Sequence, residues 1–98
     1  MFVNIIQAYR DIVAVCDKEL LGKRFEEGKF QLDVKENFYK GKDADRIKIL
    51  KIMKEMSKED ATFNIVGEKS INTALEAGII SKEEIRRIKG IPFALILL

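Results

Sequence analysis

Residues 2–16 read FVNIIQAYRDIVAVC, and this stretch decides the fold. The segments Phe2–Ile6 and Ile12–Cys16 are apolar and rich in β-branched residues, and the polar residues between them are turn-like. Two such runs around a turn predict a β-hairpin. Both faces of each predicted strand are largely apolar. This pattern indicates a sheet that is covered on two sides or that pairs with another chain.

The segment after the hairpin predicts a short helix, a turn and another strand. Asp17 is placed to cap a single helical turn that stops at Gly22. Residues 26–28, Glu-Glu-Gly, are typical of a turn, and residues 30–34 alternate between apolar and polar side chains. Alternation with period two predicts a half-buried strand.

Two longer helices are predicted in the second half of the chain. Asp43 or Asp45 can cap the first, which runs to about residue 56 and carries its apolar side chains at helical spacing. These apolar residues are Ile47, Ile49, Leu50, Ile52, Met53 and Met56. The second helix begins near Gly67 and stops at Gly78.

The C-terminal third predicts a capped turn and a closing strand. Residues 62–66 are short and β-leaning, and residues 81–84, Ser-Lys-Glu-Glu, form a capping box that begins a short helix ending at Gly90. Ile85 and Ile88 would face inward from that helix. Pro92 then starts a last strand over residues 93–97. We therefore expect a single α+β domain over residues 1–98, with an N-terminal β-hairpin and further strands in one sheet, packed with three helices.

Composition excludes several classes of function. The 98 residues contain no histidine, so a histidine-based catalytic site or an ordinary zinc site is excluded. The single cysteine, Cys16, cannot form an intrachain disulfide and suits a reducing compartment. It lies in an apolar strand, where we expect a buried thiol. We expect no cofactor and no metal site, and catalysis is the least favoured class of function.

No segment indicates a membrane or a secretory route. The longest apolar run, residues 91–98, is far shorter than the ~20 residues that span a bilayer. The N-terminus begins with a predicted strand where a leader would have a charged segment. We therefore expect a cytoplasmic protein without a membrane partner.

The order of glycines and apolar residues resembles a small archaeal family of unassigned function, DUF 424. In the first half the similar positions are Cys16, Leu21-Gly22-Lys23, Phe25, Glu27-Gly28 and Phe38-Tyr39. In the second half they are Ala61-Thr62, Asn64-Ile65-Val66-Gly67-Glu68, Ala74, Ala77-Gly78 and Gly90-Ile91-Pro92. The resemblance implies an archaeal-type cytoplasmic protein. It supplies no substrate.

The formal net charge is only +2, but positive charge is concentrated in the middle of the chain. Residues 35–58 contain eight bases and four acids, and residues 46–54 contain no acid. Lysines near an exposed aromatic ring can hold phosphates while the ring stacks a base. We expect Phe38 to be buried in the core and Tyr39, which can also cover the edge of the core, to supply the exposed ring. A lysine stripe on a helix is also commonly only a solvated face. The candidate nucleic-acid-binding residues are Tyr39, Lys40, Arg46, Lys48, Lys51 and Lys54.

A second candidate site lies where a predicted strand turns into a helix. The free N–H groups of a helix start can hold an anion. The candidate anion-binding residues are Asn64, Gly67, Lys69 and Ser70. The spacing of a P-loop is missing, and Gly67 and Asn64 can equally serve only the local backbone conformation.

These features leave three hypotheses for function. The first is a small non-catalytic binding module whose basic helix and aromatic loop contact RNA, on the ribosome or elsewhere. The second is a protein-interaction or homodimerising module without nucleic acid. The third is a small enzyme with an anion site at the Gly67 helix start, which lacks histidine for proton transfer at neutral pH.

Overall fold

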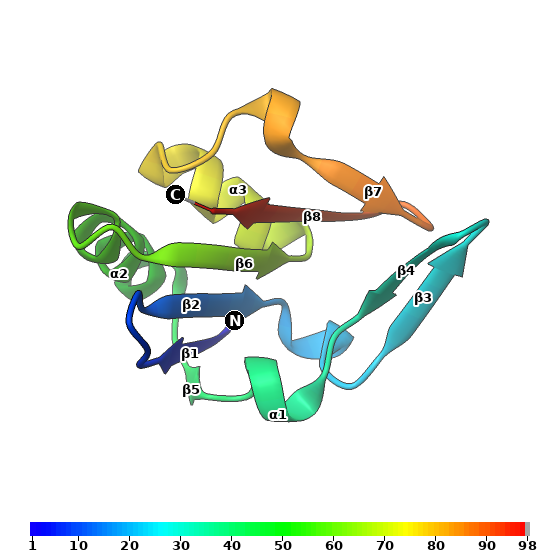
Figure 1. The fold of residues 1–98 in the computed structure, drawn as a ribbon, viewed down its shortest axis with the longest axis horizontal. Coiled ribbons are helices and arrows are strands. Elements are labelled where there is room, and N and C mark those ends of the chain that lie inside the picture. Colours follow the sequence, from blue (N-terminus) through cyan, green and yellow to red (C-terminus); the bar gives the residue numbers. More distant parts are fainter. Residues whose placement is uncertain (98) are drawn as a thin grey trace.

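The computed structural model describes residues 1–97, and its centre is one six-stranded sheet (Figure 1). The strand order is β5-β1-β2-β6-β8-β7. The strands are β1 (Phe2–Ile6), β2 (Ile12–Cys16), β5 (Lys42–Asp43), β6 (Thr62–Val66), β7 (Arg86–Ile88) and β8 (Ile91–Ile96). The α+β class is confirmed. Leu98 lies outside the described residues.

The predicted N-terminal hairpin is present and is joined to the rest of the sheet by a parallel pair. Strands β1 and β2 are antiparallel, with Val3 opposite Val15. Strand β2 then pairs with β6 in parallel, whereas β6, β8 and β7 pair with one another antiparallel. The C-terminal strand was expected in the sheet beside the N-terminal hairpin or at an interface. It is built into the sheet, but β6 lies between it and the hairpin, so the placement beside the hairpin is wrong.

Two helices cover one face of the sheet. They are α2 (Arg46–Lys58) and α3 (Glu68–Ala77), both in the half of the chain where helices were predicted. A buried apolar cluster fills the space between these helices and the sheet, and its larger members are Val13, Val15, Ile49, Met53, Phe63, Ile65 and Ile71. Within residues 1–97, no helix has both the length and the apolar character that crossing a bilayer requires.

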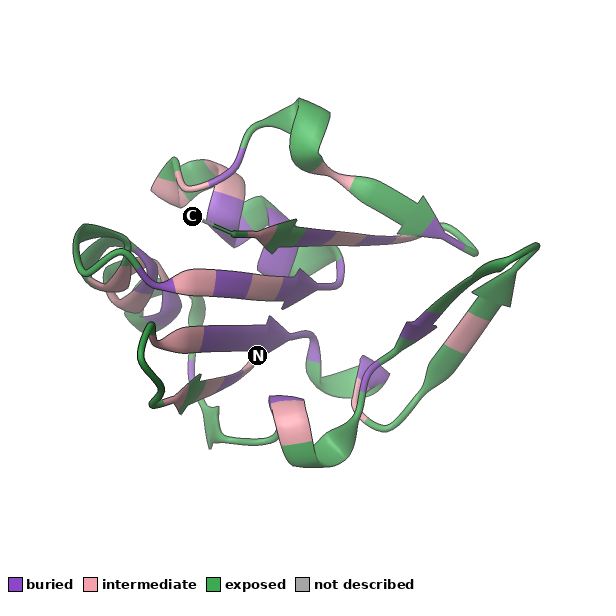
Figure 2. Cartoon of the chain, viewed as in Figure 1, coloured by how far each residue is buried: buried purple, intermediate pink, exposed green. Residues whose placement is uncertain are grey.

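The other face of the sheet is covered at one end only. Strands β3 (Arg24–Glu27) and β4 (Phe30–Asp33) form a separate hairpin, called the arm below, which projects beyond the sheet (Figure 1). The arm is joined to the sheet through a 3-10 turn, η1 (Lys18–Leu20), and a four-residue helix, α1 (Glu36–Tyr39). A second buried cluster lies here, formed by Ala14, Cys16, Leu20, Leu32, Val34, Tyr39, Val66 and Ile88. Both faces of β2 are thus covered by other parts of the same chain, which was one of the two alternatives predicted for the hairpin. Figure 2 shows that the tip of the arm is exposed.

Residues 85–88 were predicted as helix and are mainly strand, so that prediction is wrong. The capping box at Ser81 is present, but it closes only the 3-10 turn η2 (Lys82–Glu84). Strand β7 follows and pairs with β8 through a two-residue loop, Lys89–Gly90, in which both residues have positive φ. Tight hairpins favour this backbone conformation. Gly90, which was predicted to end a helix, therefore belongs to a hairpin turn.

The buried face of α2 is narrower than predicted. Ile49 and Met53 are buried, and Ile52 and Met56 are partly buried, but Ile47 is 73% exposed. One helical residue corresponds to a rotation of about 100°, which places Ile47 on the side opposite Ile49. The prediction that Ile47 belongs to the apolar face of this helix is therefore wrong.

This phase predicts a graded mutation series. Replacing the fully buried Ile49 with Ala should lower the free energy of unfolding by about 2–5 kcal/mol. Ile52→Ala should have a smaller effect because Ile52 is only partly buried. Lys51→Ala on the opposite side should change it by less than about 0.5 kcal/mol. Urea denaturation followed by circular dichroism measures all three. A Lys51→Ala effect as large as that of Ile49→Ala would show that the helix is phased differently.

Candidate functional site

A row of lysines covers the solvent side of α2. Asp45 caps the helix, since its carboxylate accepts a hydrogen bond from the Lys48 amide at 2.9 Å. With Ile49 and Met53 turned to the sheet, Lys51 and Lys54 lie on the opposite side of the helix. The lysine face is defined here as Lys48, Lys51, Lys54 and Lys58. All four are exposed, and none has an ion pair with another residue of the described range 1–97.

Two of the other predicted basic residues are already paired. The Arg46 guanidinium contacts both carboxylate oxygens of Glu76 and so ties the start of α2 to α3. The Lys40 ammonium lies 3.6 Å from the Glu36 carboxylate. Both pairs are solvent-exposed, where an ion pair contributes little to stability. Their charges are thereby partly neutralised. The lysine face has no such ion pair within residues 1–97, although the exposed Glu55 lies one turn after Lys51 on the same helix.

The expectation that Tyr39 exposes its ring is wrong. Tyr39 is only 7% exposed and belongs to the second buried cluster, whereas Phe38 is partly exposed. The two rings meet edge to face with centroids 5.0 Å apart. The side-chain amide of Asn4, in β1, donates a hydrogen bond to the Phe38 backbone carbonyl oxygen at 2.8 Å and thereby holds α1 on the sheet. This contact between distant parts of the chain helps to fix which ring of the pair faces inward.

The six predicted nucleic-acid-binding residues do not form one surface. Tyr39 packs on the face of the sheet that carries the arm, and α2 packs on the opposite face (Figure 1). The structure brings together only the α2 lysines. Lys58, at the end of the same helix, joins them and was not among the predicted site residues. The sequence already places Lys58 on this face, because it follows Lys54 by four residues, or about one helical turn.

The start of α3 is occupied by a carboxylate of the protein itself. The Asp17 side chain accepts hydrogen bonds from the Lys69 amide at 3.1 Å, the Ser70 amide at 2.9 Å and the Ser70 hydroxyl at 2.7 Å. Asp17 was predicted to cap the turn that follows it, but it makes no side-chain cap there. The backbone N–H groups that could have bound an external anion therefore already donate to Asp17. We do not propose an anion site at Gly67, Lys69 and Ser70.

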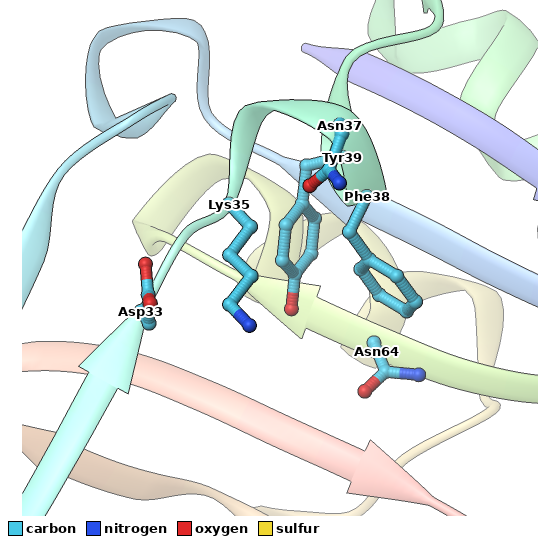
Figure 3. A pocket seen from close by; sticks show the side chains of 6 residues that line it. All are labelled: Asp33, Lys35, Asn37, Phe38, Tyr39 and Asn64. Carbon is cyan, nitrogen blue, oxygen red and sulfur yellow. The ribbon is translucent and has the colours of Figure 1, made fainter.

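Asn64 lies away from that helix start, in a cleft on the face that carries the arm. The cleft has a volume of about 440 Å³ and is lined by Asp33, Lys35, Asn37, Phe38, Tyr39 and Asn64. Figure 3 shows the side chains of Lys35, Phe38 and Tyr39 extending from the α1 segment toward Asn64 of β6. The Lys35 and Asp33 side chains lie at the end of the arm. The sequence signal for this cleft was an asparagine inside an otherwise apolar strand.

Two buried ionisable groups, Cys16 and Tyr39, belong to the second buried cluster. Burial, with a contribution from the charge of Asp17, raises the pKa of the Cys16 thiol from 9.0 to about 11. Burial, with a contribution from Cys16, raises the pKa of Tyr39 from 10.0 to about 12. The thiol is therefore protonated and unreactive near neutral pH, as its place in an apolar strand predicted. The Tyr39 hydroxyl is a neutral group over the same range.

These shifts predict a loss of stability at high pH. The pKa of each group is higher in the folded chain than in the unfolded chain, so the unfolded chain loses its protons first as the pH rises. The free energy of unfolding is therefore constant below about pH 9 and falls at higher pH. The combined loss should reach about 3 kcal/mol between pH 8 and pH 11. Urea denaturation at the two pH values measures it. Tyr39→Phe keeps the ring and removes one titrating group, so its pH dependence should be smaller than that of the wild type. Equal slopes for both proteins would contradict the assignment of Tyr39.

Among residues 1–97, no group of three or more Cys, Asp and Glu side chains is arranged to hold a metal ion. The carboxylates of the described chain mainly serve caps and ion pairs, as Asp17, Asp45 and Glu76 illustrate. The site features are therefore the lysine face on one side of the sheet and the polar cleft on the other.

This architecture defines a class of small α+β domain, with two helices on one face of a mixed sheet and a hairpin arm on the other. Residues 6–98 match the family described as "Protein of unknown function (DUF424)", and the chain belongs to this family. The resemblance noted from the sequence is thus confirmed.

One solved structure is similar over nearly the whole chain, the "Crystal structure of an uncharacterized conserved protein from Methanopyrus kandleri". The two chains are 25% identical and superpose with a TM-score of 0.82, covering 97% of this chain and 88% of the other. This similarity supports the archaeal origin that the family resemblance implied. The comparison with curated proteins found no match.

Proposed function

We propose that this protein is a non-catalytic module that binds RNA through the lysine face of α2. The observation that carries the proposal is the absence of any ion pair, within residues 1–97, at four exposed lysines on one thirteen-residue helix. Like charges side by side repel one another, and phosphates relieve that repulsion while releasing their counterions.

The geometry favours contacts with phosphates over readout of bases. The major groove of an RNA helix is too deep and narrow for side chains to read, so an exposed helix contacts the backbone. Lysine is a flexible point charge that suits such contacts. Lys48 and Lys58 lie about 15 Å apart along the helix axis, from a rise of 1.5 Å per residue. We therefore expect salt-dependent binding to structured RNA with little sequence preference, on the ribosome or on another RNA.

The triple variant Lys48→Ala, Lys51→Ala, Lys54→Ala tests this proposal. Each lysine that no longer neutralises a phosphate lowers the slope of log K against log salt by about 0.7–0.9, so the slope should flatten by roughly two to three units. Fluorescence anisotropy with a labelled RNA hairpin at several salt concentrations measures it. Folding should be unaffected because all three side chains are exposed.

A matched control separates the lysine face from overall charge. Lys23, Lys29 and Lys82 are exposed and lie outside α2, and their triple replacement with Ala also changes the net charge from +2 to −1. This control variant should keep most of the wild-type slope. Equal slopes for the wild type and the α2 variant, or an equal reduction in both triple variants, would refute a dedicated RNA-binding face.

A second candidate function is self-association or binding of a protein partner. The observation that favours it is the exposure of Leu95 in β8, at 55%, and of Leu97 just after the strand, at 69%. Light scattering on nuclease-treated protein measures the oligomeric state, and Leu95→Ser with Leu97→Ser should shift a dimer to monomer. A nuclease-treated protein that is monomeric at all concentrations would exclude self-association.

A further inference from the structure

The cleft on the arm side of the sheet is lined by polar groups that the protein does not use. Asp33, Lys35, Asn37, Tyr39 and Asn64 all contribute side chains to it. Within the described chain, none of these five side chains forms a hydrogen bond or an ion pair with another residue. By contrast, the Asn4 amide on the same face donates to the Phe38 carbonyl oxygen. Asp33, Lys35 and Asn37 are exposed and can be satisfied by solvent, whereas Asn64 is half-buried and Tyr39 is buried. These two unpartnered groups, which line a cleft together, therefore point to a ligand site.

The Tyr39 hydroxyl is the most informative of these groups. Tyr39 is 93% buried, yet its hydroxyl has no hydrogen-bond partner among residues 1–97. No fully buried side-chain N or O atom of the described residues lacks a partner, so the hydroxyl must be open to the cleft. Burial keeps it protonated, since its pKa is raised to about 12. It is a fixed neutral donor and acceptor at the wall of the cleft.

Asn64 is an unusual residue for its position. It lies in β6, between β2 and β8, and its register neighbours on the two sides are Ala14 and Leu95. Asparagine is depleted in strands, because it adds no apolar packing and its amide competes with the backbone. Ala14 beside it is small and fully buried. The amide therefore stands at the floor of the cleft with both its donor and its acceptor free.

We propose that this cleft binds an adenine nucleotide unit. A side-chain amide can pair in a bidentate manner with the adenine N6 and N7 atoms, and Asn64 supplies such an amide. The partly exposed Phe38 ring lines the same space and offers a surface on which a base can stack. The Tyr39 hydroxyl can donate to a second ring nitrogen. The volume of about 440 Å³ accommodates a base with its sugar.

The two charged residues at the end of the arm fit the rest of a nucleotide. The Lys35 ammonium can bind the phosphate. The Asp33 carboxylate can accept hydrogen bonds from the ribose hydroxyls, as carboxylates do in other nucleotide sites. Free adenosine monophosphate and an adenine within single-stranded RNA present the same chemistry. The experiment below distinguishes these two sources.

This inference is independent of RNA binding by α2. The cleft lies on the face of the sheet that carries the arm, and the lysine face lies on α2, which packs against the opposite face. The α2 triple variant should bind adenosine monophosphate as the wild type does, whereas the variants tested below should keep the salt slope measured on the RNA hairpin. The failure of one proposal is therefore distinguishable from the failure of the other.

The test is a titration of nuclease-treated, ¹⁵N-labelled protein with adenosine monophosphate, followed by NMR chemical shifts. The amide signals of Phe38, Tyr39 and Asn64 should shift together and saturate. Asn64→Asp should weaken binding about tenfold or more, and Tyr39→Phe about threefold to tenfold. Lys35→Gln should weaken binding of adenosine monophosphate but leave binding of adenosine unchanged. Asn72→Asp, at an exposed position of α3, is the matched control and should bind as the wild type does.

Two comparisons complete the test. If a short oligoadenylate saturates the cleft signals but adenosine monophosphate does not, the cleft binds adenine within single-stranded RNA. If both ligands saturate the signals, the cleft also binds the free nucleotide. Guanosine and uridine monophosphates should bind more weakly than the adenine nucleotide. The proposal is overturned if these bind equally well, if Asn64→Asp and Tyr39→Phe both bind as the wild type does, or if neither adenine ligand shifts the cleft signals at millimolar concentration.

Discussion

Removing residues 93–98 is expected to leave the chain unable to fold. Strand β8 lies between β6 and β7 and forms backbone pairs with both, so its removal leaves β7 without a partner and β6 paired only with β2. Phe93 packs against the second buried cluster, and Ala94 and Ile96 contribute to the first. Each large buried side chain contributes about 1.5–3 kcal/mol and each backbone hydrogen bond about 1 kcal/mol. Together these contributions are comparable to the ~5–15 kcal/mol that stabilise a whole domain.

The backbone pairing carries more of this effect than the sequence suggested. The apolar C-terminal run predicts buried large side chains throughout, but Leu95 and Leu97 are exposed. The double variant Leu95→Ser, Leu97→Ser is therefore a control that should melt within a few degrees of the wild type. Far-ultraviolet circular dichroism of both variants makes the comparison. A truncated chain that stays soluble and melts cooperatively near the wild-type temperature would contradict the central role of β8.

The parts of the fold that the sequence predicted are those set by local patterns. The apolar runs around residues 7–11 predicted the β1–β2 hairpin. Helical spacing predicted α2 and α3, with Asp43 or Asp45 as the cap of the first helix and Gly78 as the end of the second. The failure at residues 85–88 has a clear cause. A capping box and two isoleucines three residues apart suit a helix, whereas the Lys89–Gly90 turn that makes β7 a strand is stabilised by its pairing with β8. Pairing with β8, which is itself held in the sheet by β6, overrides a helical signal that is only a few residues long.

The candidate site was predictable only where one element carries it. Lys48, Lys51 and Lys54 share a helix, so their common face follows from helix geometry. The inward position of Tyr39 depends on how α1 is held against β1 by the Asn4 amide, a contact between residues 34 positions apart. The cleft combines the end of the arm, α1 and the centre of β6. No sequence spacing indicates that these segments meet.

Asp17→Ala is expected to destabilise the protein by about 3 kcal/mol or more. Asp17 is 3% exposed, and its carboxylate satisfies two amides and a hydroxyl at the start of α3. Its removal leaves these buried donors without a partner, although they are more than 50 positions away in sequence. Urea denaturation measures the change. Ser70→Ala removes only one of the three hydrogen bonds and should have a smaller effect.

Gly67 completes the same arrangement and makes it testable by a double-mutant cycle. Gly67 has a φ of +109°, and a Cβ atom there would lie 2.3 Å from the Asp17 Cγ atom. Gly67→Ala should therefore destabilise the protein by several kcal/mol, partly from the strained φ and partly from the clash. In the Asp17→Ala background the clash is gone and only the strain remains. The two substitutions should thus be non-additive, with the double variant more stable than their sum predicts by at least about 1 kcal/mol. Additivity within about 0.5 kcal/mol would mean that the Asp17 carboxylate does not occupy the space beside Gly67.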